Sequence, residues 1–122
     1  MIKRVDHIAL AVKNLDETLK VWHNLFGLKP SKIEIVPEQK VKAAILRVGR
    51  VKIELLEPVD SESTITKFLE KKGEGLHHIA FEVDKINEEI IIGKKVRNGL
   101  VGKVGFIHPK DTSGVLVELV QK

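Results

Sequence analysis

One short pattern occurs twice in the chain and constrains its fold more than any other feature. The segment at residues 4–13 reads RVDHIALAVK, and the segment at residues 75–84 reads GLHHIAFEVD. Aligning the two pairs His7 with His78 and keeps the apolar positions that follow in step. The apolar and polar residues alternate, as in a strand with two different faces. We therefore predict two related strands, each bearing a histidine at the same position.

A second pair of segments also matches. Residues 52–57 (KIELLE) align with residues 116–121 (LVELVQ), so that Glu54 pairs with Glu118. Each half of the chain thus opens with a His-bearing strand and closes with a Glu-bearing strand. Repetition of this kind predicts two copies of one structural module.

The pattern between the repeated strands predicts the order β-α-β-β-β in both halves. A chain of 122 residues is the size of one domain, so we expect an α+β domain with module one at 1–58, a connector at 59–75 and module two at 76–122. Spacing and turn residues give the elements. In order, we expect a strand at 3–12, a helix at 15–26, strands at 28–36, 41–48 and 51–57, a short connector helix at 64–72, a strand at 76–83, a short helix after Asp84 using Ile86, Ile90 and Ile91, and strands at 95–97, 103–108 and 114–120, with a hairpin turn at Asn98-Gly99.

Composition excludes several classes of function. The chain has no cysteine, which rules out disulfides and thiolate chemistry. It has no apolar run long enough to span a bilayer and no signal-peptide pattern. The net charge of +4 and the pI of 9.3 favour anionic partners, but aromatic residues make up only 4% of the chain, too few for stacking on bases. We expect a cytoplasmic protein with no nucleic-acid and no membrane partner.

The two glutamates and two histidines of the repeat form a candidate metal site. Glu54 and Glu118 lie in apolar strand sequence, where an unpaired carboxylate is costly to bury. At corresponding positions of two related modules, the four side chains would converge near a pseudo-two-fold axis. Two imidazoles and two carboxylates suit Zn²⁺, Co²⁺, Mn²⁺, Ni²⁺ or Fe²⁺. Two buried His–Glu hydrogen-bonded pairs without a metal remain the alternative.

Longer motifs carry a resemblance over essentially the whole chain. They are DHIALAV at 6–12, PEQ at 37–39, IELLEP at 53–58, KFLEKKGEGLHHIAFEVD at 67–84 and FIHPKDTSGVLVEL at 106–119. On these motifs the chain resembles the vicinal oxygen chelate (glyoxalase/bleomycin-resistance) superfamily, and within it the methylmalonyl-CoA epimerases. The resemblance implies a fold of two paired β-α-β-β-β modules that form an open, cupped sheet around one central metal.

The resemblance also implies a site and a reaction. The metal ligands would be His7, Glu54, His78 and Glu118, with Co²⁺, Zn²⁺, Mn²⁺ or Ni²⁺ as the ion. The reaction would interconvert the (2R) and (2S) forms of methylmalonyl-CoA by removal of the C2 proton, with a metal-stabilised enolate and with Glu118 as the base. An acyl-CoA substrate and a homodimer are expected. Two further positions are substrate-binding candidates, Gln39 and Lys110.

Two departures from the family pattern affect these expectations. Some members carry a second glutamate where this chain has Ala43, so the returning proton would come from a water molecule at the metal or from Glu54. The stretch between Val83 and Phe106 is also shorter than the family leads us to expect. Two other functions remain as alternatives: a lyase of the glyoxalase I type acting on a hemithioacetal, and a metal-free protein that binds a small molecule or confers resistance to it.

Overall fold

The computed structural model describes residues 2–99 and 101–122, and its described residues form an α+β fold, as predicted. The described strands have the sheet order β2-β3-β4-β1-β5-β8-β7-β6. The chain divides into two compact units. Ala9–His77 make up one, which we call the middle unit. The terminal unit combines the chain up to Ile8 with His78–Lys122.

The middle unit is built on three antiparallel strands and two helices. Register pairs Ala44 of β3 with Ile33 of β2 and with Leu55 of β4. The predicted bounds of both helices are confirmed. Its elements are α1 (Leu15–Phe26), β2 (Lys32–Val36), β3 (Val41–Val48), β4 (Val51–Pro58) and α2 (Thr64–Lys72), together with the end of β1 (Ile2–Ala11).

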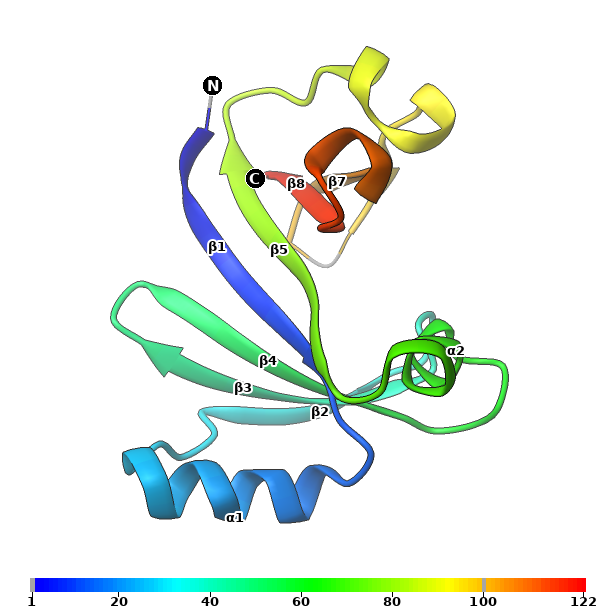
Figure 1. The fold of residues 1–122 in the computed structure, drawn as a ribbon. Helices are drawn as coiled ribbons and strands as arrows, with labels where there is room; N and C mark the ends of the chain where they lie inside the picture. The colour runs from blue at the N-terminus through cyan, green and yellow to red at the C-terminus, as the bar shows by residue number, and fades with distance from the viewer. Residues whose placement is uncertain (1, 100) are drawn as a thin grey trace. The chain divides into compact units, whose positions relative to one another are not determined.

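Helix α1 begins and ends where the sequence predicts. The Asn14 side chain accepts a hydrogen bond from the backbone N–H of Glu17, and Gly27 ends the helix with a left-handed φ of 71°. Helix α1 lies along one face of the β3–β4 hairpin (Figure 1), which its apolar stripe from Leu15 covers. Trp22 packs in this cluster as expected.

The opposite face of the same hairpin carries a different core. Ala43 and Leu56 pack there with Ile65 of α2. Because side chains alternate along a strand, Glu54 lies on this face and not on the face beneath α1. The middle unit therefore directs one of the predicted ligands away from its long helix.

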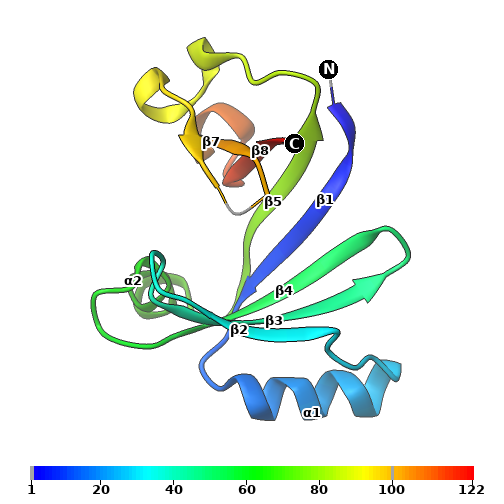
Figure 2. The ribbon, with the colours of Figure 1, turned by 180° about the vertical axis from the view of Figure 1, so that it is seen from behind.

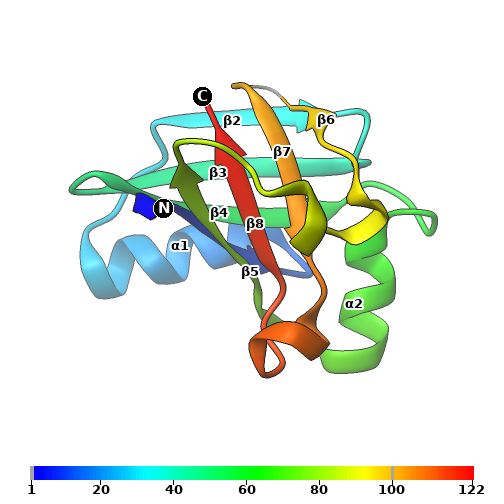
Figure 3. The same ribbon diagram turned by 90° about the horizontal axis from the view of Figure 1, so that it is seen from above.

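The terminal unit contains β5 (Gly75–Val83) from His78 onward, β6 (Arg97–Asn98), β7 (Lys103–Ile107) and β8 (Val117–Gln121). Strand β8 lies between β5 and β7 (Figure 3), parallel to the former and antiparallel to the latter. A single-turn 3₁₀ helix, η3 (Pro109–Thr112), precedes β8. Sequence analysis did not predict this turn.

The expected α-helix after Asp84 is wrong. Two 3₁₀ turns stand in its place, η1 (Glu88–Ile90) and η2 (Ile92–Lys94), and η2 lies beside β7 (Figure 2). Gly93 adopts a left-handed φ of 76°. A helix that began after Asp84 would be broken there after only a few residues. Ile86 and Ile91 are buried as expected, but Ile90 is exposed.

The last hairpin is present but shorter than expected. Strand β6 comprises only Arg97 and Asn98, not residues 95–97, and Asn98 lies opposite Lys103. The turn therefore begins at Gly99, whose N–H donates to the Gly102 carbonyl oxygen at 2.6 Å. None of the described helices has the length and apolar composition needed to cross a membrane.

Candidate metal centre

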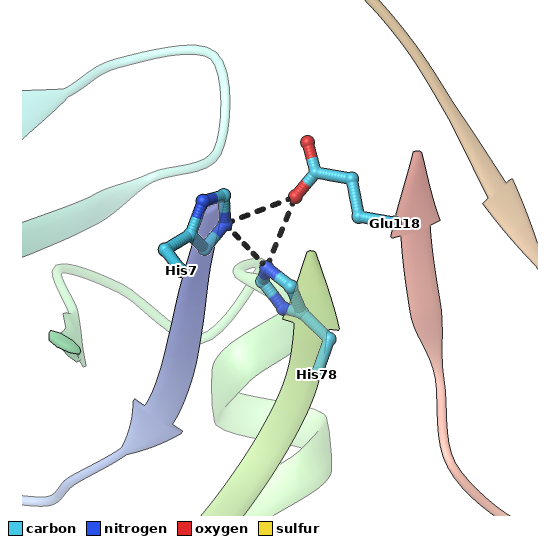
Figure 4. A group of neighbouring side chains, drawn as sticks. All are labelled: His7, His78 and Glu118. Carbon is cyan, nitrogen blue, oxygen red and sulfur yellow. Dashed lines mark hydrogen bonds and ion pairs between the residues drawn. The ribbon is translucent and has the colours of Figure 1, made fainter. Parts of the chain in front are cut away.

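Three of the four predicted ligands meet inside the terminal unit. His7 of β1, His78 of β5 and Glu118 of β8 point toward one another (Figure 4). The two Nε2 atoms are 3.2 Å apart, and Glu118 Oε1 lies 3.2 Å from His7 Nε2 and 3.1 Å from His78 Nε2. Both histidines are buried, and the glutamate side chain is only 12% exposed.

The strand register explains why these side chains share a face. Ala80 of β5 lies opposite Glu118 of β8, so His78, two residues before Ala80, projects to the same side. Phe106 of β7 lies opposite Glu118 from the other direction, and its ring meets the His78 ring edge-on at 5.9 Å. Phe106 thus adds an apolar contact beside the donors.

The charge state of Glu118 suits metal binding. Burial raises the pKa of its carboxyl, because the charged form loses hydration. Hydrogen bonds with His7 and His78, together with electrostatic attraction to the two imidazoles, outweigh burial and lower the pKa of Glu118 from 4.5 to about 2. The carboxylate is therefore ionised throughout the neutral pH range.

The donor set fits a divalent cation. The candidate ligand atoms of the three residues all lie within 4.8 Å of one another. Two imidazole nitrogens and one carboxylate oxygen suit Zn²⁺ and the neighbouring first-row metals, and three protein ligands leave coordination positions open.

The fourth predicted ligand belongs to the middle unit. Glu54 is half-buried on β4, and its place at the metal stays a prediction. His77 packs edge-on against Phe68 of the same unit, with ring centroids 4.9 Å apart. The repeat therefore selected the correct member of the His77–His78 pair for the cluster.

The substrate-binding candidates are both exposed. Gln39 lies in the turn before β3, where its backbone carbonyl oxygen accepts a hydrogen bond from Ser63 Oγ at 3.2 Å. Lys110 lies in η3, and its N–H donates to His108 Nδ1 at 3.0 Å. Both roles stay predictions. Position 43 on β3 is a buried alanine, and its methyl side chain cannot act as an acid or a base.

Sequence reasoning missed one residue at the cluster. Asp6 is buried, and its Oδ2 lies 2.7 Å from His7 Nδ1. Its position directly before a candidate ligand was the available signal. Strand alternation argued against it, since neighbouring side chains ordinarily project to opposite faces.

Comparisons with known proteins agree with this description. Residues 6–92 match the Glyoxalase/Bleomycin resistance protein/Dioxygenase superfamily. The chain is 41% identical to the uncharacterized protein YqjC of Bacillus subtilis, covering 98% of this chain and 93% of that one. It is 39% identical to the mitochondrial methylmalonyl-CoA epimerase of Homo sapiens, covering 97% and 73%. A solved methylmalonyl-CoA epimerase in complex with methylmalonyl-CoA and NH4+ is 33% identical, with a TM-score of 0.87 and coverage of 100% and 96%.

Proposed function

Since the chain belongs to the glyoxalase/bleomycin resistance protein/dioxygenase superfamily, we propose that it is a metal-dependent epimerase that interconverts the (2R) and (2S) forms of methylmalonyl-CoA. The observation that carries the proposal is the buried cluster of His7, His78 and Glu118. The similarity of the whole chain to proteins named as methylmalonyl-CoA epimerases supports the choice of substrate.

His7, His78 and Glu118 would hold the cation, with Glu54 as a fourth ligand because it is the repeat counterpart of Glu118. Co²⁺, Zn²⁺, Mn²⁺ and Ni²⁺ all suit this set. A divalent ion bound there would supply a Lewis acid for the thioester and carboxylate oxygens of the substrate, where negative charge develops.

Glu118 is the proposed base. Its carboxylate is ionised at neutral pH and only slightly exposed, so it is ready to accept a proton in a site with little competing water. The proton passes from C2 of the substrate to a carboxylate oxygen of Glu118, and the electron pair of the C2–H bond moves into the enolate. Inversion requires that a proton then returns to the opposite side of C2.

Position 43 is an alanine and cannot return the proton, so another group must do so. Two carboxylates lie on the same face of β2–β4 as Ala43. Glu34 is its cross-strand partner on β2, and Glu54 lies two residues before Leu56, its partner on β4. Glu34 is half-buried and pairs with Lys32 at 2.8 Å. We take Glu34 and Glu54 as the protein groups to test for this second role.

Recognition of the CoA moiety fits the charge of the chain. The net charge of +4 favours an anionic substrate. The exposed Lys110 offers an ammonium group for a phosphate, and Gln39 offers an amide at the turn before β3.

The test is proton NMR of methylmalonyl-CoA in D₂O with metal-reconstituted protein. We expect exchange of the C2 proton together with equilibration of the two stereoisomers, and we expect EDTA to suppress both. No exchange by a protein that holds stoichiometric metal would reject the epimerase, and turnover of a hemithioacetal would then favour the glyoxalase I type of reaction. A purified protein that neither carries nor regains metal would reject both enzymatic functions and favour a metal-free binding protein.

A further inference from the structure

A buried carboxylate lies behind one of the candidate ligands, on the side of the imidazole away from the other donors. Asp6 is 3% exposed. Its Oδ2 accepts a hydrogen bond from His7 Nδ1 at 2.7 Å, while His7 Nε2 faces His78 and Glu118. We propose that Asp6, held in turn by Lys122, is a positioning residue that fixes the ring orientation and the tautomer of His7 for metal binding.

The contact with Asp6 determines which nitrogen of His7 is available to a cation. A carboxylate only accepts hydrogen bonds, so a neutral His7 bonded to Asp6 keeps its hydrogen on Nδ1 and presents the lone pair of Nε2. The same bond opposes rotation of the ring. Carboxylates that orient metal-ligating histidines in this way raise metal affinity substantially.

Lys122 fixes Asp6 from its other oxygen. Lys122 Nζ lies 2.7 Å from Asp6 Oδ1 and 3.6 Å from Glu82 Oε1. Glu82 is also within 3.6 Å of Arg4 Nη1. The ammonium group compensates the buried charge of Asp6, which would otherwise be costly. The side chain runs from the end of β8 to β1, so it links the strands that carry Glu118 and His7.

Of the two histidines in the cluster, His7 is the one that follows an aspartate in the sequence. The internal repeat aligns Asp6 with His77, so the second module has no carboxylate before its ligand. His77 packs against Phe68 instead. The repeat therefore supplies both imidazoles, but the Asp6–His7 contact is specific to the first strand.

The inference rests on the metal site of the proposed function and not on its substrate, so metal affinity is the measurement. Competition between the full-length protein and a chelator for Co²⁺ gives the dissociation constant. We expect Asp6→Ala to weaken binding roughly 10- to 100-fold. Asp6→Asn should weaken it less, because an amide oxygen can still accept from Nδ1. Lys122→Met should also lower the affinity, because it removes the ammonium group that lies at Asp6 Oδ1.

Glu82→Gln is the matched control. It alters the same charged network through Lys3, Arg4 and Lys122. These three contacts are 3.6–4.0 Å long, so we expect its effect to stay within about twofold. An equal loss in Glu82→Gln and Lys122→Met would overturn the role of Lys122. Wild-type affinity in Asp6→Ala and Asp6→Asn would overturn the role of Asp6.

A second readout reports on the contact itself. In the Zn²⁺-loaded protein, the Nδ1 proton of His7 should give a slowly exchanging imidazole N–H signal, and Asp6→Asn, which conserves the shape of the side chain, should speed its exchange. Faster solvent exchange of this proton in Asp6→Asn supports the proposal even if Asp6→Ala fails to fold. Rapid solvent exchange of the same proton in the wild-type protein contradicts it. Wild-type protein that binds neither Co²⁺ nor Zn²⁺ would instead reject the metal-dependent function.

Discussion

After each His-bearing strand the chain takes a different course. Residues 15–26 form a helix of 12 residues that covers one face of the β3–β4 hairpin, whereas residues 88–94 form only the 3₁₀ turns η1 and η2. Ile86 and Ile91 cover the corresponding core of the terminal unit, packed with Val83 and Leu119. One unit is closed by a helix, and the other by two isoleucines from a loop.

The difference shows which parts of the module carry the chemistry. All three members of the metal-site cluster lie on strands: β1, β5 and β8. None lies in the segments where the two halves differ. A short second connection is therefore compatible with the site, because register and not helix packing aligns His78 with Glu118.

The largest expected effect separates the two repeat-related glutamates. Glu118→Gln removes the proposed base and should lower turnover about 10²- to 10⁴-fold with the fold intact. Glu54→Gln should retain far more activity where Glu54 serves only as a ligand, because an amide oxygen can still bind a cation. Isomer equilibration in D₂O measures both.

Circular dichroism of the two variants is the control for folding. Near-normal turnover by Glu118→Gln would remove Glu118 from its role as base. Equal losses in both variants would show that Glu54 takes part in proton transfer and is more than a ligand.

The sequence alone predicted the bounds of those elements whose capping residues and apolar spacing agree with their packing. Asn14, the stripe from Leu15 to Trp22 and Gly27 define α1 from one end to the other. In the second connection the predicted helix after Asp84 does not form, because Asn87 caps only the short turn η1 and Gly93 follows too soon. Apolar spacing alone could not show this, because isoleucines at 86, 90 and 91 satisfy a helix as well as a packed loop.

The site was predictable to the extent that the repeat specified it. Aligned positions selected His7, His78 and Glu118, and the structure brings these three together. Asp6 and Lys122 could not be selected in this way. Their contact joins residues far apart in sequence, and strand alternation directs Asp6 away from His7.

The loop cover of the terminal unit gives the next prediction. A Cβ on Gly105 would lie 2.8 Å from Ile91 Cδ1 and 3.0 Å from Ile91 Cγ2. Gly105→Ala should therefore destabilise the metal-free protein by about 1–3 kcal/mol in urea unfolding. Adding Ile91→Val removes the closest atom, so the double variant should recover part of the loss although Ile91→Val alone is destabilising. Additive losses would show that Ile91 does not close the core through this contact.

The smallest expected effect compares the two asparagine caps. Each accepts a hydrogen bond at 3.0 Å, Asn14 from the Glu17 N–H and Asn87 from the Glu89 N–H. Asn14→Ala should lower the free energy of unfolding by about 1 kcal/mol, because the cap begins a helix that closes a core. Asn87→Ala should cost less than about 0.5 kcal/mol, because η1 is a single turn that contains no buried residue. Urea unfolding of both variants in the metal-free protein measures the difference. Equal losses would show that the short turn contributes as much to stability as the long helix, so that the two halves are closed in energetically similar ways despite their different structures.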